Sequence, residues 1–273
     1  MSCTRTAPSP PALGTLPAST MATPPPAHSL ESAPAPPLVE PSAATPPPPR
    51  PTERFTLSDE KGRPIEVYPP FAHEGRSPLL VVLHATCMKP ASVCDWFGSA
   101  GRDQGWLVCP SGNSTCYDEP DWNGTGPAKA SFLQHAIDAV GEKIPSYVSD
   151  RPGVLIGWSR GAFAARDILY ASVSDDTLAP LAKRFRGLVL MAAKVTPDVH
   201  LLRKAGIERV VMAAGDYDGS MSTMAAAVAT LRASHIEARY VSLGRIGHVW
   251  PEDFEARMRE PIAWVAGDSA GTD

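Results

Sequence analysis

One serine of this chain lies where a nucleophile could be presented to a substrate. Residues 157–161 read GWSRG; they follow directly on an apolar run at 154–156 and precede a helical stretch from about Ala162. A sharp turn from strand to helix lifts the hydroxyl of Ser159 above the edge of a sheet, and the flanking glycines leave room for neighbouring backbone. The pattern alone is weak evidence, so the flanking elements and the residues downstream have to support it.

A serine hydroxyl is a poor nucleophile until a base accepts its proton and a carboxylate orients that base. His248 is the candidate base, because it lies on a glycine-containing loop between the last predicted strand and the last predicted helix. Asp216 and Asp218, just after a strand predicted over 210–214, are the candidate carboxylates. These residues predict a nucleophilic hydrolase.

Strands and helices must position these side chains. Short apolar runs alternate with amphipathic stretches along the chain, and this pattern is typical of an α/β fold around a mostly parallel sheet. The segment 53–273 is long enough for one such domain. Its predicted strands are 55–57, 65–68, 79–83, 106–108, 154–156, 188–191, 210–214 and 238–241. Its predicted helices are 90–104, 128–147, 162–172, 197–204, 221–233 and 254–265, and residues 110–127 are predicted to be a long loop.

Taken together, these residues resemble the α/β-hydrolase superfamily. The resemblance rests on the GWSRG turn, on the sequence GDYD at 215–218 and on a histidine beyond the final strand, and it covers most of 53–273. It implies the α/β-hydrolase fold, with helices on both faces of the sheet. The order of such triads is serine, acid, histidine, which implies Ser159, Asp218 and His248. The acid usually ends the Gly-x-x-Asp turn, so Asp216 is left as a capping or solvated turn residue.

Within the superfamily the chain looks most similar to dienelactone-hydrolase-like and polyhydroxyalkanoate-depolymerase-like esterases. Many relatives carry a lid after the strand predicted here at 188–191, whereas the spacing from Met191 to Val210 accommodates only a short helix. A small or open cleft is therefore expected.

Two backbone N–H groups are needed to stabilise the oxyanion that forms during acyl transfer. The resemblance implies the amide of Arg160, the residue after the nucleophile, as one donor. The amide of Thr86, in the loop after strand 79–83, is the other. Relatives often have His-Gly before the second donor, whereas this chain has His84 and Ala85.

Two further residues are candidates for the substrate cleft. His84 is expected to stabilise the oxyanion loop rather than to transfer protons. Trp122, in the long loop, is expected either to line the cleft or to plug the loop from inside. The side chain of Arg160 is expected either to face the pocket, where it would favour anionic acyl groups, or to pair with an acidic group at the surface.

Four cysteines, Cys87, Cys94, Cys109 and Cys116, form two pairs with a spacing that is too long for paired zinc ligands. Two disulfides are therefore favoured over free buried thiols, and they imply an oxidising compartment. The sequence does not determine the connectivity; local pairs, 87–94 and 109–116, are the working guess.

Residues 1–52 differ in composition from the rest, with 16 of the 30 prolines and only four charged side chains. Such a segment has too little apolar bulk to form a core, so we predict a disordered, semi-stiff tether. Cys3, directly ahead of it, resembles the end of a lipoprotein processing site whose hydrophobic part would lie upstream; an incidental cysteine is the alternative. A lipidated Cys3 would tether an exported protein to a membrane.

The formal charge of −4 provides no basic patch for nucleic acid. The expected function is that of a serine-dependent hydrolase of small-molecule or polymer carboxylic esters, which needs neither a metal nor an organic cofactor. Two alternatives stay open: a peptidase or amidase with the same triad, and a non-catalytic, exported binding domain. Acyl and alcohol specificity and oligomeric state are not determined by the sequence.

Overall fold

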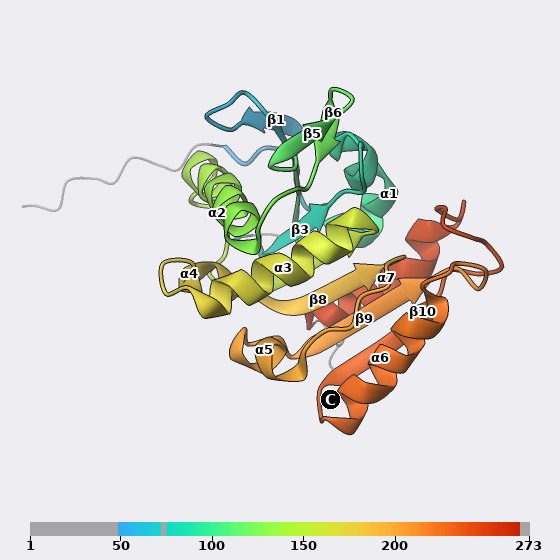
Figure 1. Cartoon of the computed structure of the whole chain (residues 1–273). Coiled ribbons are helices and arrows are strands. Elements are labelled where there is room, and N and C mark those ends of the chain that lie inside the picture. The colour runs from blue at the N-terminus through green and yellow to red at the C-terminus, as the bar shows by residue number, and fades with distance from the viewer. Residues whose placement is uncertain (1–48, 72–74, 268–273) are drawn as a thin grey trace, which may run out of the picture. The chain divides into compact units, whose positions relative to one another are not determined.

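The computed structural model describes residues 49–71 and 75–267 (Figure 1). Within these residues the main sheet has eight strands in the order β1-β2-β4-β3-β7-β8-β9-β10. The strands are β1 (Phe55–Ser58), β2 (Pro64–Tyr68), β3 (Leu79–Leu83), β4 (Trp106–Pro110), β7 (Gly153–Trp158), β8 (Phe185–Met191), β9 (Arg209–Ala214) and β10 (Glu237–Ser242). The helices are α1 (Pro90–Arg102), α2 (Gly126–Lys143), α3 (Arg160–Ser174), α4 (Ala179–Ala182), α5 (Val199–Lys204), α6 (Met221–Ala233) and α7 (Phe254–Ala266).

Within the main sheet, the strands from β4 to β10 pair in parallel, whereas β1 pairs with β2, and β2 with β4, in antiparallel fashion. Parallel strands must be buried on both faces, which explains why β3 and β7 are apolar throughout. The predicted mostly parallel α/β architecture is confirmed.

Helices cover both faces of the sheet and bury two separate apolar clusters (Figure 1). In β3, Leu79, Val81 and Leu83 face the cluster under α2, α3 and α6. Leu80 and Val82 face the cluster under α1 and α7. This alternation follows from the two-residue repeat of a strand. The carboxyl ends of the parallel strands consequently meet at one edge, where the loops that carry the candidate residues begin.

The long loop predicted over 110–127 contains a hairpin of two short strands, β5 (Ser114–Cys116) and β6 (Glu119–Asp121). Its two turn residues, Tyr117 and Asp118, both have positive φ, 46° and 67°, as two-residue hairpin turns require. Strands of three residues are too short to produce a recognisable alternation, and prolines and glycines surround them. The sequence therefore predicted a loop here.

The described residues form two disulfides, Cys87–Cys116 and Cys94–Cys109. The local pairing guessed from the sequence is wrong. Cys94 lies on α1 and faces the core, where it meets Cys109 of the neighbouring strand β4; the hairpin returns Cys116 to the turn that follows β3. The Cα–Cα distances of 5.5 and 6.0 Å are those that a disulfide can bridge.

Cys3 and all but the last four residues of the predicted tether lie outside the described residues, so the tether and the lipid anchor stay predictions. Among residues 49–71 and 75–267, no helix combines the length and the apolar character needed to cross a bilayer.

The buried disulfide Cys94–Cys109 should act mainly on stability. Both cysteines are fully buried, and the bridge closes a loop of 15 residues. We expect the double substitution Cys94→Ala/Cys109→Ala to lower the free energy of unfolding by about 3 kcal/mol, since the unfolded chain regains loop entropy. Urea unfolding of the oxidised wild type and the double variant measures this difference. A change below about 1 kcal/mol would contradict it.

Candidate active site

The turn at Ser159 is held in an uncommon backbone conformation. Strand β7 ends at Trp158, Ser159 has φ 52° and ψ −113°, and α3 begins at Arg160. A Cβ atom at Gly157 would collide with the backbone of Gly161, and one at Gly161 would collide with the carbonyl oxygen of Leu83 in β3. Both positions therefore require glycine. The close approach presents the serine at the carboxyl edge of the sheet.

The structure brings Ser159, Asp218 and His248 together, although 89 residues separate the serine from the histidine. Nε2 of His248 lies 2.9 Å from Oγ of Ser159. Nδ1 of His248 lies 2.8 Å from Oδ2 of Asp218. With the Nδ1 proton donated to the carboxylate, Nε2 is free to accept the serine proton.

The loops after β9 and β10 are joined to each other through their backbones. The amide of Asp216 donates to the carbonyl of Gly244 at 2.8 Å, and that of Tyr217 donates to the carbonyl of Ile246 at 2.9 Å. A Cβ at Gly215 would collide with the carbonyl oxygen of Ile246. These contacts fix the distance between the carboxylate and the imidazole.

Asp218 is the carboxylate that the imidazole contacts. Its side chain is only 4% exposed. Burial alone raises the pKa of Asp218, but hydrogen bonds from the amide and hydroxyl of Ser220 and from His248 outweigh it, so the pKa lies below its ordinary value. The group is therefore ionised at neutral pH. Asp216 instead accepts a hydrogen bond from Oγ of Ser242 at 2.5 Å, which separates the two candidate carboxylates.

The two amides that are predicted to donate to the oxyanion lie in different elements, one at the start of a helix and the other in a turn. Arg160 is the first residue of α3, where an N–H group has no partner within the helix. Thr86 is exposed in the turn after β3. In the described part of the chain, neither amide donates to another backbone group. Both are thus free to bind an oxyanion, and this role stays a prediction.

His84 and Trp122, the two candidates for the cleft, have fully buried side chains and do not line one; His84 was expected to stabilise the oxyanion loop, and Trp122 either to line the cleft or to plug the long loop. Nε2 of His84 accepts a hydrogen bond from the amide of Gly112 at 3.0 Å, and Nδ1 lies 2.6 Å from the carbonyl oxygen of Ala85. The neutral imidazole thus links the oxyanion loop to the segment after β4. The ring of Trp122 packs against His84 and Phe132, with centroids 5.6 and 5.8 Å away, which fits the expectation of a plug.

Solved structures with the same fold come from several bacteria. A fluorophosphonate-binding serine hydrolase of Staphylococcus aureus matches with a TM-score of 0.56 and 11% identity, over 79% of this chain and 98% of that one. A carboxylesterase of Mesorhizobium loti matches with a TM-score of 0.55 and 17% identity, over 79% and 99%. This chain has the α/β-hydrolase fold. An uncharacterised Bacillus cereus protein matches at TM-score 0.55 and 18% identity, over 71% of this chain and 61% of its own.

No family model matches the sequence of this α/β-hydrolase-fold chain, and neither does any curated protein sequence. The comparisons therefore support the fold, and the chemistry has to be argued from the residues.

A cluster of stacked aromatic rings lies beneath His248, and the sequence analysis missed it. Trp250 stacks on Trp158 with centroids 3.8 Å apart, and on Trp96 with centroids 5.3 Å apart. Trp158 in turn lies 5.9 Å from the imidazole of His248, and Phe254 meets Trp250 edge-on at 4.6 Å. The signal was present, since one tryptophan precedes the serine and another follows the histidine by two positions. Only the fold brings them together.

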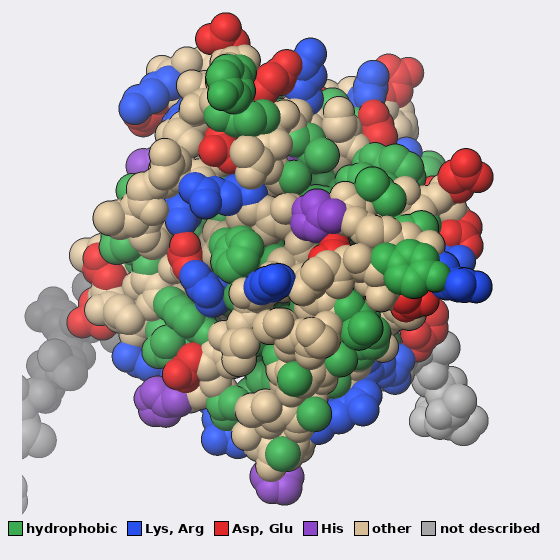
Figure 2. Space-filling view, turned by 45° about the vertical axis from the view of Figure 1, so that its right-hand side comes forward, with side chains coloured by type: hydrophobic (Ala, Val, Ile, Leu, Met, Phe, Trp, Pro, Cys, Tyr) green, Lys and Arg blue, Asp and Glu red, His purple; other side chains and the backbone are tan. Residues whose placement is uncertain are grey.

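The candidate active site is open to solvent at the imidazole. The side chain of His248 is 53% exposed, and the neighbouring Val249 and Tyr217 are 55% and 63% exposed. Figure 2 shows one face of the molecule, on which hydrophobic side chains lie scattered among charged and polar ones. The exposure of the imidazole is thus established, and the small or open cleft stays a prediction.

A cavity of about 640 Å³ lies elsewhere, between the β1–β2 turn and α2, and the three candidate residues do not line it. Within the described residues, no group of three or more histidine, cysteine, aspartate or glutamate side chains is arranged to hold a metal ion.

His84 should make the stability of the protein depend on pH. Burial lowers its pKa from 6.5 to about 4, so the unfolded chain binds a proton in this range that the folded chain does not. The contribution of neutral His84 to the free energy of unfolding is present in full above about pH 6.5 and is lost as the pH falls towards 4. We expect it to amount to about 3 kcal/mol between pH 7 and pH 4.

Urea unfolding of the wild type and of His84→Asn at pH 7 and pH 4 measures this contribution. The variant should be less stable at pH 7 but should lose less stability on acidification, because it has no imidazole to protonate. The same loss in both proteins would show that another group is responsible.

Proposed function

We propose that this chain is a serine hydrolase that cleaves carboxylic esters through an acyl-enzyme. The observation that carries the proposal is the hydrogen-bonded chain from Ser159 through His248 to Asp218, with distances of 2.9 and 2.8 Å. The fold shared with a protein described as a serine hydrolase and another described as a carboxylesterase is consistent with it.

In the first half of the reaction, Oγ of Ser159 attacks the ester carbonyl carbon and its proton moves to Nε2 of His248. Asp218 stabilises the imidazolium that forms, and the amides of Thr86 and Arg160 stabilise the oxyanion. His248 then donates the proton to the departing alcohol. In the second half, water attacks the acyl carbon with His248 as the base, the bond to Oγ of Ser159 breaks as His248 returns the proton to it, and the carboxylic acid leaves.

The exposure of His248 and of its neighbours supports substrates that need no deep enclosure. Small esters and the accessible ends of ester polymers both satisfy this condition. The disulfides support a further proposal, that the protein works in an oxidising compartment outside the cytoplasm, because cytosolic reductants keep most thiols reduced. The membrane tether through Cys3 stays part of this proposal.

Removing the hydroxyl of Ser159 should abolish turnover without unfolding the protein. We expect Ser159→Ala to lower kcat on p-nitrophenyl acetate by at least about 10⁴-fold, since no nucleophile remains. The matched control is Ser174→Ala, because Ser174 is an exposed serine at the other end of α3 and should retain wild-type rates. Circular dichroism checks the fold of both variants. Most of the activity remaining in Ser159→Ala would contradict the proposal.

The two neighbouring aspartates provide a second test. Asp218→Asn should lower kcat by about 10⁴-fold, because an amide stabilises neither the required tautomer nor the imidazolium. Asp216→Asn changes a carboxylate two residues away that contacts Ser242 instead of His248, and we expect it to change kcat by less than about threefold. Steady-state kinetics on the same ester measure both. Equal losses in the two variants would mean that Asp218 is not the orienting acid.

A further inference from the structure

The β5–β6 hairpin is joined to the turn that carries Thr86. Cys87, the residue after Thr86, is disulfide-bonded to Cys116 at the end of β5. The amide of Met88 donates to the carbonyl of Pro120 in β6 at 3.2 Å. Cys87 itself has a positive φ of 49°, a conformation that non-glycine residues seldom adopt unless the surroundings hold it. The hairpin thus fixes the backbone beside the Thr86 amide.

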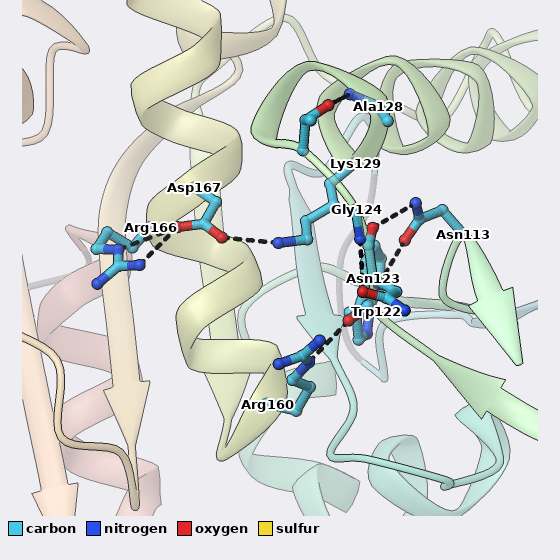
Figure 3. Close-up of polar contacts among 10 residues, drawn as sticks. Asn113, Trp122, Asn123, Gly124, Ala128, Lys129, Arg160, Arg166 and Asp167 are labelled. Carbon is cyan, nitrogen blue, oxygen red and sulfur yellow. Dashed lines mark hydrogen bonds and ion pairs between the residues drawn. The ribbon is translucent and has the colours of Figure 1, made fainter. Parts of the chain in front are cut away.

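The same hairpin is also joined to the other predicted donor. Nε of Arg160 donates to the carbonyl of Trp122, the residue after β6, at 2.7 Å (Figure 3). In the described part of the chain the guanidinium makes no ion pair, which was one of the two alternatives, and turning Nε towards an anionic substrate would break its bond to Trp122. The acceptor is fixed as well, because the ring of Trp122 is fully buried.

Further contacts hold the base of the hairpin and the helix opposite it. Asn113 and Asn123 exchange two hydrogen bonds across the base, at 2.8 and 3.1 Å (Figure 3). Nζ of Lys129 in α2 lies 2.7 Å from Oδ2 of Asp167 in α3, and the lysine side chain is only 7% exposed. A buried ion pair of this kind resists sliding of the two helices, since either charge alone would be costly to bury. The base of the hairpin is therefore held closed, and α2 is tied to the middle of α3.

We infer that the β5–β6 hairpin sets the separation of the two oxyanion donors, with Cys87 and Cys116 as positioning residues. The inference rests on the proposed function. The two disulfides then have different tasks. Cys94 and Cys109 are fully buried in the core, whereas Cys87 and Cys116 are only partly buried, beside the site. Removing the Cys87–Cys116 bridge frees the Thr86 turn to leave the geometry that an oxyanion needs.

The test compares Cys87→Ser/Cys116→Ser with the matched double variant Cys94→Ala/Cys109→Ala. Loss of an oxyanion donor lowers kcat by about 10²–10³-fold. We expect the first variant to lose about 10²-fold in kcat on p-nitrophenyl acetate with KM changed less than about threefold, and its activity to keep the wild-type dependence on pH because the triad is intact. The second variant should lose stability but should keep kcat within about threefold.

Reduction of the wild type provides a measurement that needs no substitution. Dithiothreitol transfers two electrons and two protons to the bridge, which becomes two thiols, and the reagent closes to its cyclic disulfide. Activity should fall in step with alkylation of Cys87 and Cys116, mapped by mass spectrometry, before Cys94 and Cys109 react, and it should return on reoxidation.

Unchanged kcat in Cys87→Ser/Cys116→Ser, or full activity in wild type alkylated at Cys87 and Cys116, would overturn the inference and leave the proposed function standing. If Ser159→Ala hydrolyses esters as fast as the wild type, both this inference and the proposed function are overturned.

Discussion

The close approach of the β7–α3 turn to strand β3 is the constraint on which the site depends. Only glycine at 161 lets the backbone pass so near the carbonyl of Leu83, and only glycine at 157 leaves room for the backbone of Gly161. The turn holds the serine between them at positive φ. The buried parallel strands on either side prevent relaxation of the turn. Because β7, β9 and β10 run in the same direction, their carboxyl ends deliver the serine, the carboxylate and the histidine to one edge.

The electrostatics of the site follow from unequal burial along that edge. Asp218 is buried and receives hydrogen bonds that keep it charged, whereas the imidazole it contacts is half exposed. On one side the imidazole lies beside the ring of Trp158, which stacks on Trp250. The result is a rigid arrangement that stays open to solvent.

Much of this could be predicted from local patterns. Apolar runs indicated the main strands, and the order of serine, aspartate and histidine gave the three residues that the fold brings together. The hairpin inside the predicted long loop and the cysteine pairing could not be predicted, because β5 and β6 are three residues each and the cysteine partners are set by tertiary contacts. Helix ends were missed for local reasons: α2 begins two residues early behind the Thr125 cap, with Pro127 in its first turn, and it ends ahead of Pro145. Burial of His84 and Trp122 depends on a three-dimensional core that no periodicity reveals.

The central claim is that Ser159 is an activated nucleophile, and covalent labelling tests it most directly. A fluorophosphonate reagent reacts quickly only with a serine whose proton a neighbouring base accepts. Intact-mass measurement followed by peptide mapping should find one adduct per chain, on Ser159, and labelling should be slowed strongly in His248→Ala. Labelling spread over several serines, or equally fast in the histidine variant, would contradict the account.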